Sequence, residues 1–293
     1  MKKVLITANI HPYLQNRLEE LGYFVQVKED VERAELVAII EVYEVLIITT
    51  YTKVDKELID IARNLKIVGR VGSGMENVDI DYCKQKNIQC VNSPEGNGNA
   101  VGEHCLAMLL NLMNNINKAN NELKQNIFNR EENRGVELDG KSVGIIGYGH
   151  TGSAFAKKLR GFEAEVLVYD KYKKTQDDFV QQVSLDEIKR RCDVISFHVP
   201  YHEETHYYLN VDFIADCAKN PIFINTSRGA VVNTLDILDA LENKKITGFC
   251  IDVFEDEPIH KNKIHPWEIY QKLIAKDNVR ATRHIAGCTI ESK

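Results

Sequence analysis

Short apolar, β-branched runs alternate with amphipathic helical patterns along most of the chain. In the first part of the sequence these runs lie at 4–7, 24–27, 45–48, 67–71 and 90–92. Stretches with the helical spacing of apolar residues separate them, as over 54–65. Strands that alternate with helices form parallel sheets with the helices packed on their faces. The pattern therefore predicts an α/β unit at the start of the chain.

A second series of apolar runs predicts a second parallel sheet. These runs end in polar or charged residues and lie at 143–146, 166–169, 194–199, 222–225 and 249–254. Ligands of open parallel sheets bind beyond the carboxyl ends of the strands. We therefore expect Val199, Pro200 and Thr226, which lie at the ends of two of these runs, to face a cofactor crevice.

A glycine-rich turn, GYGHTG at 147–152, follows the first strand of this second series. A helical pattern comes next, and then a strand that ends at Asp170. Strand, glycine turn, helix, strand and terminal acid together form the dinucleotide-binding fingerprint. Gly147 permits the tight turn, Gly149 lets the backbone approach a pyrophosphate, and Gly152 lets the helix pack closely on the strand.

The residues around this turn indicate which dinucleotide is bound. His150 and Thr151 begin the helix, whose N–H groups and dipole attract phosphate. Asp170 can accept the ribose hydroxyls and would repel a 2′-phosphate, so the sequence predicts NAD rather than NADP. The alternative is that nearby cations accept the extra phosphate, namely Lys171, Lys173 and Lys174.

A second glycine-rich turn, GRVGSGMENVD at 69–79, lies between a strand and a helix of the first unit. Such a turn can aim consecutive backbone N–H groups at an anion. It can equally be a plain connection in which the glycines serve only the backbone geometry. The local sequence leaves both interpretations open.

A long helical pattern runs from Ala100 to about Leu123, after the turn-forming segment PEGNGN at 94–99. Its apolar residues are too many for one helix face buried on one domain. We expect this helix both to bridge two domains and to pack against a second subunit, which makes a homodimer.

Composition excludes several classes of protein. The length of 293 residues suggests about two domains. The net charge of −6 gives no support for a nucleic-acid partner. The seven cysteines are scattered and form no CxxC pair, which favours reduced thiols in a cytoplasmic protein and argues against a metal site. No stretch approaches a membrane span, so we expect no membrane partner.

Three polar residues at or beyond predicted strand ends are candidates for chemistry: Arg228, Glu257 and His284. Each alone has an ordinary explanation. The arginine suits a surface charge, the acid lies in an acidic run that suits a solvated loop, and the histidine suits a hydrogen-bonded core position. Their common place at the carboxyl edge of a dinucleotide sheet is what makes them candidates together.

These residues lie in motifs that resemble the D-isomer-specific 2-hydroxyacid dehydrogenases, with the D-3-phosphoglycerate dehydrogenases as the nearest branch. In chain order the motifs are GRVGSGMENVD, GYGHTG, TSRGAVV, IDVFEDEP and HIAG, and they cover nearly the whole chain. The resemblance implies two doubly wound parallel-sheet α/β domains with the active site in the cleft between them. It places a Rossmann NAD domain at 95–277, inserted into a flavodoxin-like substrate domain made of 1–94 and 278–293.

The resemblance also implies roles for the candidate residues. His284 would be the acid/base, Glu257 its partner, and Arg228 the group that grips the substrate carboxylate and polarises the keto oxygen. The chemistry fits, because histidine exchanges protons near neutral pH. A neighbouring carboxylate stabilises imidazolium, and arginine offers a planar fork that matches a carboxylate.

Further contacts follow from the same resemblance. Backbone N–H groups near Ser73 and Gly74 would hold the substrate carboxylate, and Asp252 would lie near the nicotinamide carboxamide. Phosphoglycerate-specific members often carry an arginine where this chain has Thr49 or Thr50, so a phosphate contact would have to come from Arg70 or Lys53.

The end of the chain also departs from the family pattern. Members continue into a helix that returns to the first domain, whereas this sequence ends at Lys293, shortly after His284. Either that helix is missing from the sequence or the product is unusually short.

We therefore expect a cytoplasmic, NAD-dependent oxidoreductase (EC 1.1.1.-). It would transfer hydride between nicotinamide and C2 of a small D-2-hydroxy or 2-keto acid, with D-3-phosphoglycerate as the expected substrate. One alternative is a glyoxylate/hydroxypyruvate or other D-2-hydroxyacid reductase. An alternative from another class is an NAD(H)-sensing binding protein, like the C-terminal-binding corepressors of this superfamily.

Overall fold

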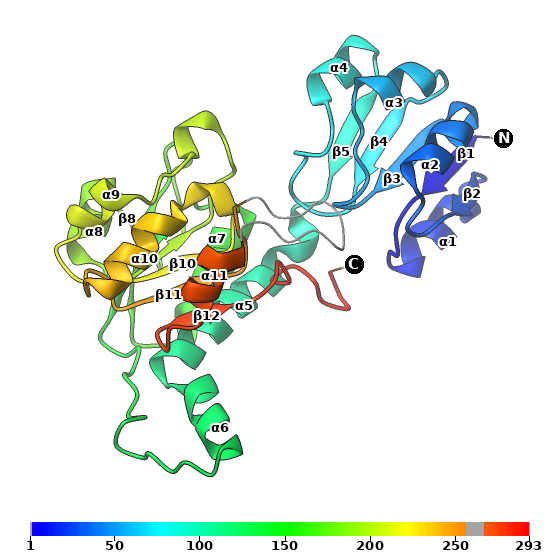
Figure 1. The fold of residues 1–293 in the computed structure, drawn as a ribbon. Helices are drawn as coiled ribbons and strands as arrows, with labels where there is room; N and C mark the ends of the chain where they lie inside the picture. The colour runs from blue at the N-terminus through cyan, green and yellow to red at the C-terminus, as the bar shows by residue number, and fades with distance from the viewer. Residues whose placement is uncertain (1, 256–266, 293) are drawn as a thin grey trace. The chain divides into compact units, whose positions relative to one another are not determined.

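Two separate parallel sheets organise the chain (Figure 1). The computed structural model describes residues 2–255 and 267–292. Within these, one compact unit contains residues 2–97 and 288–292, and the other contains 98–255 and 267–287. Each unit has its own sheet and its own buried apolar clusters.

The sheet of the first unit has five parallel strands in the order β2-β1-β3-β4-β5. The strands are β1 (Lys3–Ile6), β2 (Phe24–Val27), β3 (Val45–Ile48), β4 (Ile67–Arg70) and β5 (Gln89–Asn92). This is the flavodoxin-like strand order, and its switch point lies between β1 and β3. The predicted fold class is confirmed for this unit.

Helices cover both faces of this first sheet. On one face α1 (Pro12–Glu20) packs Leu14 and Leu18 against the strands. On the other face lie α2 (Arg33–Ile39), the short 3₁₀ turn η1 (Ile40–Val42), α3 (Lys56–Ile61) and α4 (Ile80–Gln85). There Leu36, Leu58 and Cys83 are buried against the sheet. Alternate residues of one strand point to opposite faces, so β-branched runs serve both layers.

Helix α3 is shorter than the helical pattern at 54–65 predicts. Val54 forms an isolated parallel bridge with Val78 instead of joining the helix. Asp55 then caps the helix, because its carboxylate accepts a hydrogen bond from the N–H of Leu58 at 3.1 Å. The bridge depends on a distant segment and the capping bond on one local side chain, and apolar periodicity indicates neither of them.

The second unit has seven parallel strands in the order β12-β11-β10-β9-β6-β7-β8. The strands are β6 (Ser142–Ile146), β7 (Glu165–Tyr169), β8 (Gln181–Gln182), β9 (Val194–Phe197), β10 (Ile222–Asn225), β11 (Gly248–Ile251) and β12 (Val279–Ala281). This is the Rossmann order extended by one strand, with its switch point between β6 and β9. The predicted Rossmann fold is confirmed.

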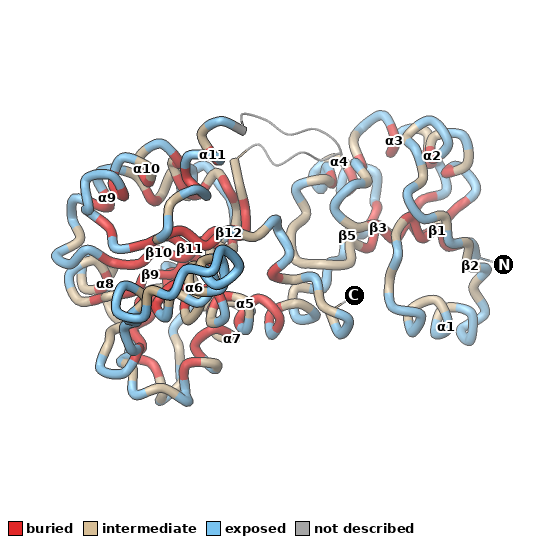
Figure 2. The backbone as a smooth tube through the Cα atoms, turned by 60° about the horizontal axis from the view of Figure 1, so that its bottom comes forward, coloured by how far each residue is buried: buried red, intermediate tan, exposed pale blue. Residues whose placement is uncertain are grey.

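Two layers of helices bury this second sheet. One face carries α5 (Glu95–Met113) and α7 (His150–Lys158), which continues into the 3₁₀ turn η2 (Leu159–Gly161). The other face carries α8 (Leu185–Arg191), α9 (Val211–Ala215), α10 (Thr234–Glu242) and α11 (Trp267–Ile274). Figure 2 shows that burial is concentrated along the strands between these layers. Each large apolar side chain buried there contributes about 1.5–3 kcal/mol.

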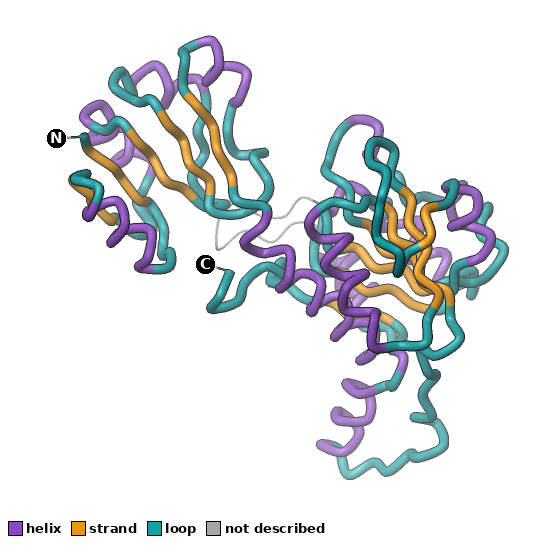
Figure 3. Tube along the Cα trace, turned by 180° about the vertical axis from the view of Figure 1, so that it is seen from behind, coloured by secondary structure: helices purple, strands orange, loops and turns teal. Residues whose placement is uncertain are grey.

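The long helix predicted from Ala100 to about Leu123 is two helices. Helix α5 ends at Met113, and α6 (Ile116–Lys124) begins after Asn115, whose φ is +53°. Asparagine tolerates this left-handed conformation better than other non-glycine residues, which explains why the helix breaks here. Figures 1 and 3 show α6 and the segment that follows it extending away from the rest of the second unit.

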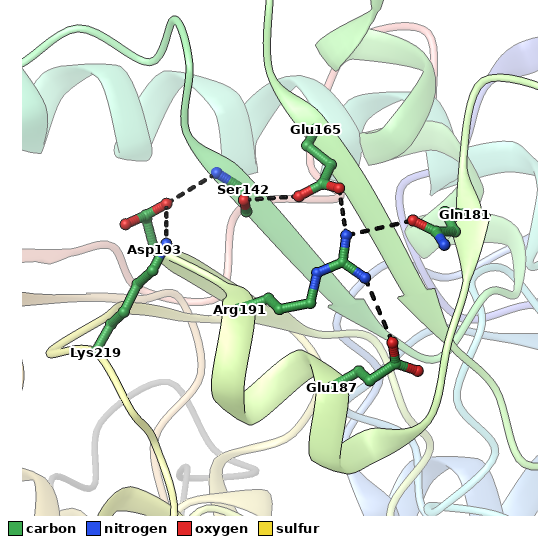
Figure 4. A network of polar contacts seen from close by, with 7 residues as sticks. All are labelled: Ser142, Glu165, Gln181, Glu187, Arg191, Asp193 and Lys219. Carbon is green, nitrogen blue, oxygen red and sulfur yellow. Dashed lines mark hydrogen bonds and ion pairs between the residues drawn. The ribbon is translucent and has the colours of Figure 1, made fainter.

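A polar network ties the amino ends of three strands of the second sheet together (Figure 4). Arg191 pairs with Glu165 at the start of β7, and the Ser142 hydroxyl donates to the same carboxylate at 2.9 Å. Asp193 accepts from the Ser142 N–H and from the Lys219 ammonium, both at 2.9 Å. Burial raises the pKa of Asp193, but these two donors outweigh it and lower that pKa below its usual value.

The chain leaves the second unit later than the predicted boundary at 278. Strand β12 pairs with β11 in the second sheet, with Phe249 opposite Val279. Residues 279–287 therefore belong to the second unit, and only 288–292 belong to the first. At the other boundary the division falls between Asn97 and Gly98, within α5.

Candidate functional site

The carboxyl ends of the strands in the second sheet gather most of the predicted site residues at one edge. The dinucleotide turn follows β6, Asp170 follows β7, and Val199 and Pro200 follow β9. The remaining strands add Thr226 and Arg228 after β10, Asp252 after β11 and His284 after β12. Because all the strands are parallel, these ends lie at the same side of the sheet.

The three glycines of the turn differ in what a side chain at each position would meet. Gly147 has φ of +91°, and a Cβ there would meet the carbonyl oxygen of His198 at 2.6 Å. A Cβ on Gly152 would meet the carbonyl oxygen of Gly147 at 2.1 Å, so helix and turn are in direct contact. A Cβ on Gly149 would meet nothing within 4 Å. Gly147 and Gly152 therefore serve the fold, and Gly149 leaves open space above the turn.

That open space lies at the start of α7, which suits a phosphate group. Gly149 is the cap of the helix and offers no side-chain hydrogen bond to its first turn. His150 and Thr151 are the first residues of the helix. The first N–H groups of a helix lack intrahelical partners and carry the positive end of the dipole. The turn therefore fits the pyrophosphate of a dinucleotide, as the sequence predicts.

Asp170 has a structural task that the sequence does not indicate. Its carboxylate accepts three backbone hydrogen bonds, from Tyr148 at 2.7 Å, Tyr172 at 2.9 Å and Lys173 at 2.8 Å. Burial raises the pKa of Asp170, but these bonds outweigh it and hold that pKa below its usual value. The group stays charged and fixes the glycine turn to the end of β7. A carboxylate has about four acceptor positions, so room for a ribose hydroxyl remains.

A buried histidine supports the first turn of α7, and it is not among the residues predicted from the sequence. The Nδ1 atom of His198 lies 3.2 Å from the Thr151 hydroxyl, and its Nε2 atom lies 2.8 Å from the Ser196 hydroxyl. Burial lowers the pKa of His198 to about 3, so the ring is neutral at physiological pH. The available signal was a polar pair, Ser196 and His198, on alternate positions of a strand that is otherwise apolar.

Other predicted cofactor residues also lie at this edge. Pro200 accepts a hydrogen bond from the Thr205 hydroxyl through its carbonyl oxygen at 2.8 Å. Val199 packs against the apolar cluster beneath the sheet. The Thr226 hydroxyl lies 3.2 Å from the sulfur of Cys105 on α5. These contacts fix the strand ends, and they leave the role of each residue toward a cofactor as a prediction.

Arg228 is held by a tight turn at the end of β10. The Asn225 side chain donates to the carbonyl oxygen of Arg228 at 2.9 Å, and it accepts from the hydroxyl of Ser227 at 2.7 Å. Gly229 begins the 3₁₀ turn η4 (Gly229–Val231), and a Cβ there would meet the carbonyl oxygen of Phe254 at 1.9 Å. Only glycine allows this close approach, which brings the loop of Arg228 against the segment that follows β11.

His284 lies in a loop that the buried Asp252 carboxylate holds. The carboxylate accepts from the N–H of Ile285 at 2.9 Å and of Ala286 at 2.8 Å, and its side chain is 1% exposed. The N–H of His284 donates to the carbonyl oxygen of Asp252 at 2.6 Å. His284 has φ of +48°, which costs about 1–2 kcal/mol. Hydrogen bonds to a charged group contribute about 1.5–3 kcal/mol each, so they outweigh the strain.

The predicted partner of His284 lies outside the described residues. This is Glu257, and the described chain stops at Glu255 just before it. Glu255 is not the solvated residue that an acidic run suggests. Its carboxylate accepts from the Tyr207 hydroxyl at 2.6 Å and from the N–H of Thr234 at 2.9 Å. These two bonds fix the point from which the segment carrying Glu257 departs.

The predicted substrate residues of the first unit lie together at the end of β4. Gly72 has φ of +129°, and a Cβ there would meet Nη1 of Arg70 at 1.8 Å, so the guanidinium lies against the glycine turn. Nη2 of Arg70 donates to the Thr50 hydroxyl at 3.2 Å. The Ser73 hydroxyl donates to Asn97 at 2.8 Å, and its neighbour Gly74 continues the turn. These contacts place a guanidinium and a hydroxyl at the turn, and the binding of an anion there stays a prediction.

The part of the chain that the structure describes has neither a metal-binding cluster nor a helix suited to cross a membrane. No group of three or more His, Cys, Asp or Glu side chains there is placed to hold a metal ion. None of its helices combines the length and the apolar character that crossing a bilayer requires.

The open position above Gly149 gives a direct test of the dinucleotide site. We expect Gly149→Ala to fold as the wild type does, because its Cβ meets no protein atom. It should nevertheless weaken NADH binding about tenfold or more, since the methyl group occupies the approach of the pyrophosphate. Calorimetric titration and thermal unfolding measure the two quantities. Gly161→Ala, where a Cβ also meets nothing, is the control and should change neither. Wild-type affinity in Gly149→Ala would show that the pyrophosphate lies elsewhere.

Comparisons with known proteins agree with this geometry. A family profile described as "D-isomer specific 2-hydroxyacid dehydrogenase, NAD binding domain" matches residues 106–286. The chain is 33% identical to the D-3-phosphoglycerate dehydrogenase of Archaeoglobus fulgidus over 294 residues, which cover 99% of this chain and 54% of that protein. It is 34% identical to the hydroxypyruvate reductase of Thermotoga maritima over 265 residues, covering 90% of this chain and 85% of that one.

Among solved structures, the D-lactate dehydrogenase of Aquifex aeolicus, complexed with NAD and lactic acid, superposes with a TM-score of 0.85 at 31% identity. That match covers 99% of this chain and 90% of the other. The chain spans about half the length of the D-3-phosphoglycerate dehydrogenases it matches. The profile match alone covers more than half of the chain and confirms the family predicted from the motifs. The chain therefore belongs to the D-isomer specific 2-hydroxyacid dehydrogenase family, and its second unit is the family's NAD-binding domain.

Proposed function

We propose that the chain is an NAD-dependent oxidoreductase that transfers hydride between nicotinamide and C2 of a D-2-hydroxy acid. The observation that carries the proposal is the position of His284. Its loop is fixed to the buried Asp252 carboxylate at the same sheet edge as the dinucleotide turn. Arg228 follows a strand at that edge as well. The family match supports this assignment.

The chemistry assigns one task to each side chain. In the oxidation direction, the C2–H bond breaks with its electron pair, the hydroxyl proton passes to the imidazole of His284, and C2–O becomes a carbonyl. Bound NAD supplies the hydride acceptor. Arg228 would hold the substrate carboxylate with its planar fork and polarise the C2 oxygen. Glu257, outside the described residues, would stabilise the imidazolium.

The proposed substrate is D-3-phosphoglycerate, oxidised to 3-phosphohydroxypyruvate, a reaction of serine biosynthesis. Arg70 supports a phosphorylated acid, because its guanidinium lies against the glycine turn and next to Thr50. A fixed guanidinium together with backbone N–H groups suits a carboxylate and a phosphate on one small molecule. The name of the A. fulgidus relative points to the same substrate.

A second candidate is the reduction of hydroxypyruvate or a related 2-keto acid. The match to the T. maritima hydroxypyruvate reductase favours it, since that match covers 85% of the relative against 54% for the phosphoglycerate dehydrogenase. The two candidates share the chemistry at C2 and differ only in whether a phosphate group is recognised.

We also propose a preference for NAD over NADP. Backbone hydrogen bonds lower the pKa of Asp170 despite its burial, so the carboxylate stays charged and repels a 2′-phosphate. Of the nearby lysines, Lys171 already pairs with Glu204 at 2.5 Å. A cytoplasmic location is part of the proposal, because none of the seven cysteines forms a disulfide.

A homodimer is the proposed assembly, formed through α5 and the α6 segment that continues from it. Within the described chain, the segment 116–136 exposes large apolar side chains to water: Ile116, Leu123, Ile127, Phe128 and Val136. Phe128 is 87% exposed. Apolar groups gathered on one projecting segment mark a protein contact, and a two-fold axis would bury two such segments against each other.

Replacement of the proposed acid/base tests the reaction. With NADH and a panel of phosphohydroxypyruvate, hydroxypyruvate, glyoxylate and pyruvate, the wild-type chain should consume NADH with at least one acid. His284→Ala should lower turnover by about 10²-fold or more with NADH affinity unchanged. His11→Ala, an exposed histidine, is the control. Undiminished turnover in His284→Ala would show that His284 is not the acid/base. Tight NADH binding by the wild-type chain without turnover on any acid would favour an NAD(H)-sensing binding protein.

Replacement of Arg70 separates the two substrate candidates. Arg70→Gln should lower kcat/KM for phosphohydroxypyruvate about tenfold more than for hydroxypyruvate, because only the first acid carries a phosphate. Arg63→Gln, a guanidinium with a 79% exposed side chain, should change neither. An equal loss for both acids would contradict a phosphate contact at Arg70.

The state of assembly is measured by light scattering after size exclusion. The wild-type chain should run as a dimer, and Phe128→Asp should shift it toward the monomer, because a charge cannot be buried in an apolar contact. Tyr13→Asp alters a side chain on α1 that is 69% exposed, and it should leave the dimer intact. A wild-type monomer at micromolar concentration would overturn the assembly.

A further inference from the structure

Three side chains that are distant in sequence form a polar chain inside the second unit. His104 lies on α5, Asp252 follows β11, and Thr282 follows β12. The Nε2 atom of His104 lies 2.8 Å from the Thr282 hydroxyl. That hydroxyl lies 2.6 Å from Oδ1 of Asp252, and His104 Nε2 lies 3.8 Å from the same oxygen. The reaction proposed above gives no task to His104 or Thr282.

The donors in this chain follow from the chemistry of the three groups. An ionised carboxylate only accepts, so the single hydroxyl proton of Thr282 points to Asp252. The competing acceptor is the Met108 sulfur at 3.7 Å, which is farther away and weaker. The hydroxyl oxygen must then accept from His104, so Nε2 of that ring carries a proton. Both bonds therefore point toward the carboxylate.

The same carboxylate binds the loop of His284, so the orientation of the carboxylate affects the position of that loop. Its two oxygens accept the N–H groups of Ile285 and Ala286, directly after His284. Oδ1 is shared by the Thr282 hydroxyl and the Ile285 N–H, and Oδ2 accepts from Ala286. Thr282 thus fixes the rotation of the carboxylate at which both loop N–H groups can reach it.

We propose that His104 and Thr282 are positioning residues, which hold the buried Asp252 carboxylate against the backbone of residues 285 and 286 and so set the position of His284. The inference rests on the proposed function for the importance of His284, but the contacts themselves do not. His284 has a left-handed backbone, which surrounding contacts must maintain.

Burial explains why the chain of bonds matters. The Asp252 side chain is 1% exposed, so water cannot replace a donor that is lost. His104 is 20% exposed and lies at the outer end of the chain. Loss of the Thr282 hydroxyl removes one of the three hydrogen-bond donors that the described residues give this charged, buried group. The carboxylate is then free to rotate, and its bonds to the loop lengthen.

The test pairs each disruptive variant with one that keeps the hydrogen-bonding group. Thr282→Val removes only the hydroxyl, and Thr282→Ser retains it. His104→Leu removes the donor, and His104→Gln places an amide N–H where Nε2 lies. Thr247→Val is the matched control, since the Thr247 hydroxyl bonds to the Asn220 carbonyl oxygen at the opposite edge of the sheet.

Two readouts are measured on the full chain. Amide hydrogen exchange at residues 285 and 286, without cofactor, reports the loop. Turnover and KM with NADH and the best acid of the panel report the position of His284. We expect Thr282→Val and His104→Leu to speed exchange at both amides and to lower kcat about tenfold or more, with the Kd for NADH within about threefold. Thr282→Ser and His104→Gln should restore most of both, and Thr247→Val should alter neither.

Unchanged exchange at residues 285 and 286 in both disruptive variants would overturn the inference. Faster exchange with unchanged kcat would also overturn it, because the bonds would then serve the fold alone. A wild-type chain without turnover on any acid would be a failure of the proposed function. The exchange data would still decide whether His104 and Thr282 hold the loop.

Discussion

A single buried carboxylate is the interaction on which the candidate site depends. Asp252 directly follows β11, the neighbour of the edge strand β12, and its side chain has almost no contact with water. A charge in that position is tolerated only when donors surround it. Here the donors are a hydroxyl and two backbone N–H groups, all from the loop that carries His284. The buried charge is stable only while these donors reach it, so the loop must keep the backbone conformation that supplies them.

The parallel sheet supplies the rest of the arrangement. Seven strands that run in one direction bring residues from six separate segments to one edge, although these segments are spread from Gly147 to His284 along the chain. Close backbone contacts then fix the loops. Gly152 touches the carbonyl of Gly147, and Gly229 touches that of Phe254, so neither position can carry a side chain. The backbone at Arg228 and at His284 and the dinucleotide turn are thus held in place by contacts within the second unit, which limits the entropy lost on binding.

Much of this was predictable from the sequence. Apolar runs marked the strands, and both sheets have the strand orders implied by the family resemblance. Glycine spacing located the turn, because few other residues satisfy its geometry. The predictions failed where a single local residue decided the structure. Asn115 adopts a left-handed backbone and divides the long helix, and Asp55 caps a helix that apolar spacing would have begun earlier.

Contacts between distant segments were also not predictable from the sequence. The hydrogen bond between His104 and Thr282 joins residues 178 positions apart, and no periodicity connects them. His198 supports Thr151 from a neighbouring strand in the same way. The three N–H groups that Asp170 accepts depend on the path of the loop after β7. Residue types at strand ends suggest which groups carry chemistry, whereas the residues that hold them in place emerge only from the folded chain.

In the reaction proposed above, hydrogen moves as hydride from C2 of a D-2-hydroxy acid to the nicotinamide held by the second unit. The most direct measurement is mass spectrometry of the NADH formed from NAD and D-3-phosphoglycerate deuterated at C2. We expect NADH that carries the deuterium, formed from the D isomer and not from the L isomer. NADH without deuterium, or equal reaction of both isomers, would contradict it.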